Sequence, residues 1–196
     1  MCARPYHHGD LRAALLTSAE QALREKGAAE LTLRELAREV GVSHTAPRRH
    51  FRDMNALLDA LAVTGYERLA RVAAEADDPS LPFAQRLVAH GRAYLRFAAD
   101  NGALLELMLA RKHAPEAEEQ LLPTLERTIA SLRHMIVEAQ ERGDLVRDDP
   151  HAVMVSAGAA LHGLAAFVAN GTLAPEPASE ALDALVRHLL QGLTPR

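Results

Sequence analysis

The sequence predicts an all-α protein of about nine helices. Aromatic residues make up only 4% of the 196 residues, whereas Ala and Leu are abundant. This balance favours helices over a β-sandwich or barrel. Apolar residues recur at helical spacing, no segment alternates as a half-buried strand would, and Gly and Pro cluster at the breaks. The predicted helices cover residues 11–26, 32–40, 43–51, 53–76, 83–99, 104–113, 125–142, 150–169 and 177–193.

Charge is distributed unevenly along the chain. Residues 1–52 hold nine basic and six acidic residues, a net charge of +3, whereas the remainder holds 13 basic and 20 acidic residues. The whole chain therefore carries −4. A basic N-terminal part on an acidic body is typical of a protein whose one end binds a polyanion.

The stretch LTLRELAREVGVSHTAPRRHF has the pattern of two helices joined by a tight turn. Thr32 is placed to cap the first helix, with Glu35 three residues later as its capping-box partner. Gly41 allows the chain to reverse. Ser43 is placed to cap the second helix.

The end of this stretch, GVSHTAPRRHF, predicts a DNA contact. In helix-turn-helix proteins the second helix enters the major groove with its N-terminus first. Pro47 lies in or just after the first turn, where its missing N–H has little effect, and Phe51 is expected to turn inward and anchor the helix. Small and polar side chains near that end suit base edges, and the flanking cations suit phosphate or guanine.

The same residues resemble the TetR family of transcriptional regulators. LTLRELAREVGVSHTAPRRHFRDMNALLDAL (31–61) resembles the signature region of the family, and the likeness is strong over residues 8–65. YLRFAADNGALLELM (94–108) and AALHGLAAF (159–167) resemble the C-terminal domain of one subgroup. The resemblance implies a cytoplasmic homodimer that binds a palindromic operator in double-stranded DNA, is more often a repressor, and is released by a small-molecule effector.

Two domains follow from this interpretation. We expect a helix-turn-helix DNA-binding domain over residues 1–52, with the start of a connecting helix over 53–76. The break DDPSLP then opens a ligand-binding and dimerisation domain over 77–196.

Individual DNA contacts are carried over from the resemblance. At two positions the chain departs from the family pattern: Arg48 stands where a phosphate-binding tyrosine is usual, and Met54 where a lysine usually starts the fourth helix. An arginine can replace the first contact, whereas Met54 cannot hydrogen-bond phosphate. The predicted DNA-binding residues are Thr32, Arg34, Ser43, His44, Thr45, Ala46, Arg48, Arg49 and His50.

The body offers a dimer interface and a ligand pocket. Small residues on the 152–169 helix permit close approach of another helix, and with the last helix it can form half of a four-helix interface. The residues expected in the interface are Ser156, Ala160, His162, Gly163, Phe167, Leu182, Leu185 and Leu189. The residues expected in the pocket, with plain core packing as the alternative for each, are His90, Tyr94, Phe97, Met108, His134 and Met135.

Three other classes of protein are conceivable: a membrane protein, an enzyme and a protein-interaction scaffold. The 152–169 segment has 18 residues, fewer than the ~20 that a membrane-spanning helix needs. It is rich in Ala and Gly and contains His162. We therefore interpret it as a buried helix and expect no membrane partner. No HExxH, CxxC or Gly-rich phosphate loop is present, so we expect no metal, no cofactor and no enzyme. A helical protein-interaction scaffold is the other alternative.

Overall fold

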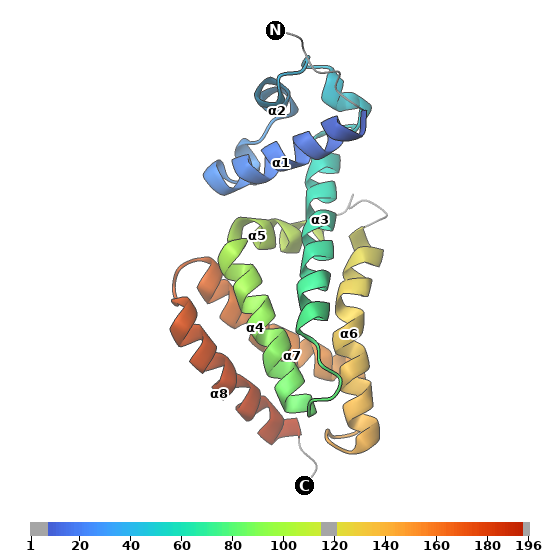
Figure 1. Ribbon diagram of the computed structural model, residues 1–196, viewed down its shortest axis with the longest axis vertical. Helices are drawn as coiled ribbons and strands as arrows, with labels where there is room; N and C mark the ends of the chain where they lie inside the picture. The colour runs from blue at the N-terminus through green and yellow to red at the C-terminus, as the bar shows by residue number, and fades with distance from the viewer. Residues whose placement is uncertain (1–7, 115–120, 194–196) are drawn as a thin grey trace. The chain divides into compact units, whose positions relative to one another are not determined.

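The computed structural model describes residues 8–114 and 121–193, which form eight α-helices, two 3₁₀ helices and no strand (Figure 1). The helices, with η marking the 3₁₀ ones, are α1 (His8–Lys26), η1 (Ala28–Glu30), α2 (Leu33–Val40), η2 (Ala46–Arg49), α3 (Met54–Ala76), α4 (Phe83–Asp100), α5 (Gly102–Arg111), α6 (Leu121–Arg142), α7 (Pro150–Ala169) and α8 (Pro175–Leu193). The all-α prediction is confirmed.

The predicted count of nine helices is wrong by one, because the third predicted helix is the short turn η2 rather than an α-helix. Its bonds from the Arg48 N–H to the Thr45 carbonyl and from the His50 N–H to the Pro47 carbonyl span three residues. Pro47 has no N–H to donate, and the segment is too short for an α-helix to propagate. Ser43 does not cap a helix here; its Oγ lies 3.3 Å from Thr45 Oγ1.

The chain divides into two compact units, which are described separately. The first unit comprises the chain up to Gly65 together with Ala103–Pro123, so it holds α1, α2, η2, the first half of α3 and most of α5. Its core includes Leu15, Leu36, Phe51, Leu57, Leu61, Leu104 and Met108, all buried. A Cβ at Gly65 would come within 2.6 Å of Met108 Sδ, so the glycine lets α3 and α5 pack closely.

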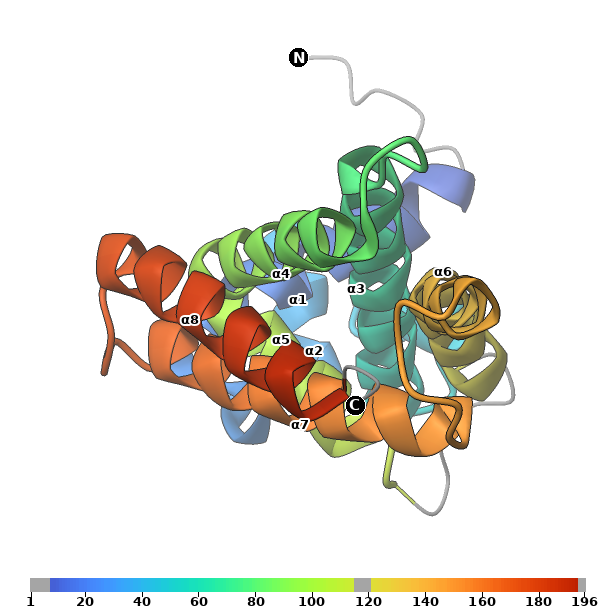
Figure 2. The same ribbon diagram turned by 90° about the horizontal axis from the view of Figure 1, so that it is seen from below.

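The second unit comprises Tyr66–Gly102 and the chain from Thr124 onward. Within it α4, α7 and α8 pack against one another in pairs (Figure 2). A Cβ at Gly91 on α4 would lie 2.6 Å from Leu182 Cδ1, so Gly91 allows the close approach of α8. Asp149 caps α7 as a hydrogen-bond acceptor for the His151 N–H at 3.0 Å.

Within the described residues, α7 is the one helix that is long and apolar enough to cross a membrane by those two criteria. Its partners in the second unit are α4 and α8. A core helix of a soluble protein meets the same two criteria, but only 28% of the apolar stretch of α7 is buried, so the prediction of a buried helix is wrong for a single copy of the chain.

Candidate functional site

The start of α2 is fixed by a side-chain cap. Thr32, in extended conformation, accepts a hydrogen bond from the Glu35 N–H at 3.2 Å through Oγ1. The carboxylate of Glu35 bonds Lys26 instead of completing a capping box, with 2.5 Å between Nζ and Oε1. This hydrogen bond is the main cause of the lowered pKa of Glu35. Thr32 and Arg34 are left exposed at the first turn of α2.

The turn after α2 is built as the sequence predicts. Gly41 adopts a left-handed conformation with φ of 78°, which favours glycine. The Val42 N–H donates to the Ala37 carbonyl at 2.9 Å and closes the end of the helix. Ala37, Pro47 and Phe51 are buried, and they anchor η2 to the rest of the helix-turn-helix.

Most of the predicted DNA-binding side chains face solvent around this turn. The exposed ones are Thr32, Arg34, Ser43, His44, Thr45, Arg48 and Arg49. Ala46 and His50 are half-buried, because the turn brings them toward the core beside Pro47. The exposed turn and the first turn of α2 therefore present polar and cationic groups, the chemistry that base edges and phosphates accept.

A surface hollow of about 750 Å³ joins the start of α2 to the start of the exposed turn. Its lining includes Thr32, Arg34 and His44, together with Arg38. Arg38 is one helical turn beyond Arg34, a spacing that could have identified it as a further cation of this surface. The carboxylate of Glu35 is the acidic group in the lining, and it pairs with Lys26 at 2.5 Å and, at a longer distance of 3.9 Å, with Arg38.

Arg12 on α1 is a second cation that the sequence interpretation missed. Its guanidinium carbon lies 5.4 Å from the ring centroid of Phe51, in a cation–π arrangement. Arg12 is exposed. No local sequence signal links these two residues, because the contact depends on how α1 packs over the turn.

The start of α3 differs from a free helix N-terminus. Asp53 Oδ1 accepts a hydrogen bond from the Ala56 N–H at 2.8 Å, as a helix cap does. Arg52 Nε lies 3.3 Å from Asp53 Oδ2. Met54 is half-buried. The carboxylate occupies a position that would otherwise attract a phosphate, so any contact there depends on Arg52 and on the remaining N–H groups.

The predicted pocket residues do not all lie together. His90, Phe97 and Met135 are buried in the second unit, and Tyr94 is half-buried there. The His134 side chain is 74% exposed and pairs with Glu138 on α6 at 3.2 Å, so it points to solvent. Met108 is buried in the first unit, against Gly65. Of the six predicted pocket residues, four remain for an interior site in the second unit: His90, Tyr94, Phe97 and Met135.

Tyr94 and His162 link α4 to α7. The Tyr94 hydroxyl lies 2.9 Å from His162 Nδ1, and the two rings are tilted with centroids 6.3 Å apart. Burial raises the pKa of Tyr94 to about 12, so its hydroxyl keeps its proton at neutral pH. His162 therefore has an interior partner on α4 in addition to its place on α7.

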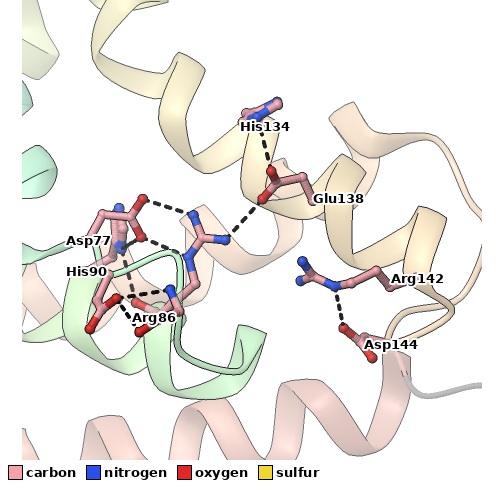
Figure 3. Close-up of polar contacts among 9 residues, drawn as sticks. Asp77, Arg86, His90, His134, Glu138, Arg142 and Asp144 are labelled. Atoms are coloured by element: carbon pink, nitrogen blue, oxygen red, sulfur yellow. Dashed lines mark hydrogen bonds and ion pairs between the residues drawn. The ribbon is translucent and has the colours of Figure 1, made fainter.

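A buried arginine joins three segments of the second unit. The Arg86 guanidinium donates to Asp77 Oδ1 and Oδ2 at 2.8 and 2.9 Å and to Glu138 Oε2 at 3.0 Å (Figure 3). These hydrogen bonds are the main reason why the pKa values of Asp77 and Glu138 are lowered, and why that of Arg86 is raised. Because all of its charge is compensated by two carboxylates, Arg86 is a structural cross-link between α4, α6 and the segment before α4.

The predicted interface residues fall into three groups. Ser156, Gly163 and Phe167 are exposed on α7, with Phe167 at 52%. The half-buried ones are Ala160, His162, Leu185 and Leu189. Leu182 is buried against Gly91, where a second copy of the chain could not reach it. Val155 of α7, also 52% exposed, was missed.

The helix-turn-helix has a buried core and an exposed cationic turn, and it is joined to a helical body. This architecture defines a DNA-binding regulator. Comparison with family models supports this class. Residues 15–61 match the model for bacterial regulatory proteins of the tetR family, and residues 87–193 match that for a tetracyclin repressor-like C-terminal domain. The chain belongs to the TetR family of transcriptional regulators.

Solved structures with the same fold include a protein of unknown function from Rhodococcus sp. RHA1, 40% identical over 98% of this chain and 100% of that one, with a TM-score of 0.86. A tetR-family regulatory protein from Rhodococcus RHA1 is 22% identical over 91% and 96% of the two chains, with a TM-score of 0.73. The TetR-family regulator PfmR from Thermus thermophilus is 20% identical over 93% and 96%, with a TM-score of 0.71. A search of curated proteins found no significant match.

Family membership makes this chain a DNA-binding transcriptional regulator with a helix-turn-helix. TetR-family regulators are ligand-responsive repressors and typically homodimers. The matched family and the relatives named as tetR-family proteins are transcriptional regulators.

Proposed function

We propose that the exposed turn around η2 reads the operator, with His44 and Thr45 at base edges and Arg48 and Arg49 on phosphates or guanine. The observation that carries this assignment is the exposure of these four side chains on a turn anchored by buried Phe51. Anchoring from the core side holds the exposed groups in one orientation, which specific recognition requires.

The phosphate contacts extend from the turn to the first turn of α2. Thr32, Arg34 and Arg38 border the same surface hollow as His44, so one DNA strand can contact both segments. Arg48 supplies a cation where the family pattern has a tyrosine, and this offsets the missing lysine at Met54.

Dimerisation is proposed to use the exposed face of α7. Val155, Ser156, Gly163 and Phe167 give it an apolar surface with small residues, and the half-buried Leu185 and Leu189 of α8 extend it. A two-fold axis through this face repeats each contact, which is how symmetric dimers form. Two turns one DNA helical repeat apart, ~34–36 Å, would then read a palindrome.

The proposed outcome of binding is repression, because a dimer seated on a promoter excludes polymerase. A small molecule bound inside the second unit, in the region of His90, Tyr94, Phe97 and Met135, would release the DNA. The protein is proposed to act in the cytoplasm, where the chromosome is, and to do so without catalysing a reaction.

The salt dependence of DNA affinity tests this assignment. We expect the logarithm of the association constant to fall linearly with the logarithm of salt concentration, and Arg49→Ala to make the slope shallower by about one for each phosphate that the arginine neutralises. Arg133→Ala is the matched control, because Arg133 is exposed on α6 and the substitution removes the same charge. Equal slopes for the two variants would contradict the assignment of Arg49 to DNA.

A further inference from the structure

Arg12 carries a positive charge that no acidic residue compensates within residues 8–114 and 121–193. The residue is exposed on α1 and takes part in no ion pair of that part of the chain. Its guanidinium carbon instead lies 5.4 Å from the ring centroid of Phe51. Arg12 therefore has a defined contact but no partner of opposite charge.

The basic residues of α1 and the helix-turn-helix fall into two groups. Those that pair with a carboxylate are Arg24, Lys26, Arg38 and Arg52. Those that form no ion pair within the described part of the chain are Arg12, Arg34, Arg48 and Arg49. The last three of these are assigned to DNA, so Arg12 shares their lack of a partner although it lies on another helix.

The position of Arg12 is next to the exposed turn. Within the first unit, α1 packs against both α2 and η2 (Figure 1). Phe51 directly follows His50, the last residue of the predicted DNA-binding set, and is only 3% exposed. Because the Arg12 guanidinium rests against this ring, the cation lies beside the turn and not on it.

The contact with Phe51 leaves the hydrogen-bond donors of Arg12 available. A guanidinium is planar, so it can meet an aromatic ring with its face while its N–H groups donate from its edge. Phe51 therefore restricts the movement of the cation without satisfying its donors. A group held in this way loses less conformational entropy when it binds a ligand.

Phosphate is the ligand that fits such a cation. Each strand of DNA carries one phosphate per ~3.4 Å of helix axis, so a duplex seated on the exposed turn presents phosphates to the protein surface beside that turn. Contacts to the backbone commonly flank the contacts to base edges. Arginine also matches phosphate geometry, because two of its N–H groups can donate to two phosphate oxygens.

We propose that Arg12 is a further phosphate contact in the operator complex, held beside η2 by Phe51. This inference rests on the proposed function, since it adds a residue to the same DNA-binding surface and extends that surface from α2 and η2 to α1. A phosphate contact carries no sequence information. Arg12 should therefore strengthen the binding of operator and of other DNA alike.

Arg12→Met tests the proposal, with Arg24→Met as the matched control. Arg24 is also exposed on α1, so both variants lose one positive charge from the same helix, but Arg24 pairs with Glu20. Affinity for a fluorescently labelled duplex of random sequence would be measured by anisotropy over a series of salt concentrations. We expect the log–log slope to become shallower by about 0.9 for Arg12→Met and to stay at the wild-type value for Arg24→Met.

Two further measurements separate a phosphate contact from a structural role. Arg12→Lys keeps the charge and should keep most of the slope, whereas a slope as shallow as that of Arg12→Met would overturn the proposal. If Arg12→Met does not fold, the ¹⁵Nε resonance of Arg12 in the wild-type protein decides, because it should shift on addition of the duplex. A wild-type slope for Arg12→Met, an equal change for Arg24→Met, or an unmoved Arg12 resonance would each overturn the proposal.

Arg49→Ala is measured beside these variants to test the proposed function by itself. If Arg49→Ala makes the slope shallower and Arg12→Met does not, the Arg12 proposal is wrong and the assignment of the exposed turn stands. If only Arg12→Met changes the slope, the assignment of Arg49 fails and that of Arg12 stands. A folded wild-type protein that binds no duplex would overturn both.

Discussion

Replacing Arg86 by methionine should destabilise the second unit far more than replacing a surface arginine of the same helix. Arg86 is 4% exposed and makes three charge-assisted hydrogen bonds of 2.8 to 3.0 Å to Asp77 and Glu138. Removing one member of a buried ion pair typically costs about 3–5 kcal/mol, because the other member is left without compensation. Since Asp77 retains some contact with solvent, we expect the lower end, about 3 kcal/mol.

The loss would be measured by urea unfolding at neutral pH and one fixed protein concentration, because the stability of a dimer depends on concentration. A loss of that size corresponds to a lowering of Tm by about 6–12 °C for a chain of this length. Arg92→Met is the matched control on the same helix. Arg92 is 50% exposed and pairs with Asp183 on the surface, so its loss should be about 0.5 kcal/mol.

The comparison has a clear contrary outcome. Equal losses for Arg86→Met and Arg92→Met would mean that the buried network adds no more than a surface pair. The conclusion that Arg86 cross-links three segments would then be incorrect.

Three further predictions follow from the same structure. The pKa values of Asp77 and Glu138 are lowered in the folded protein, so their stabilising effect is complete above the unfolded values of 3.8 and 4.5 and is lost as pH falls through the lower folded values. The difference in unfolding free energy between wild type and Arg86→Met should therefore shrink on acidification below about pH 5. A constant difference by urea unfolding would refute this. Phe167→Asp should give a folded monomer by light scattering, because the side chain is half exposed within one copy; a persistent dimer would argue against the α7 face. Thr32→Ala should lower stability by about 1 kcal/mol through loss of the helix cap, with Thr32→Ser close to wild type; equal losses for the two would argue against a capping role.

The helix-turn-helix could be predicted from the sequence because local chemistry determines it. The Thr32 cap and the left-handed Gly41 each depend on neighbours within a few residues, and the structure shows both. The Asp149 cap of α7 was predictable for the same reason.

Which face each helix of the second unit buries was harder to predict. Leu182 fits an interface on the amphipathic pattern of α8, but Gly91 of α4 leaves a space that draws it into the core. His134 has the spacing of an interior residue, but Glu138 four residues later offers it a surface partner. The position of Leu182 depends on a residue distant in sequence, which periodicity does not report, whereas the pairing of His134 with Glu138 is local. The short turn η2 likewise depends on how Pro47 is packed.

The most direct test of the central claim is selection of bound sequences from a random duplex pool at about physiological salt. The account predicts an enriched palindrome whose half-sites lie about one helical turn apart, and loss of the enriched positions when His44 or Thr45 is replaced by alanine. A folded, dimeric protein that enriches no sequence, with or without candidate effectors, would contradict the assignment of the exposed turn around η2 to operator recognition.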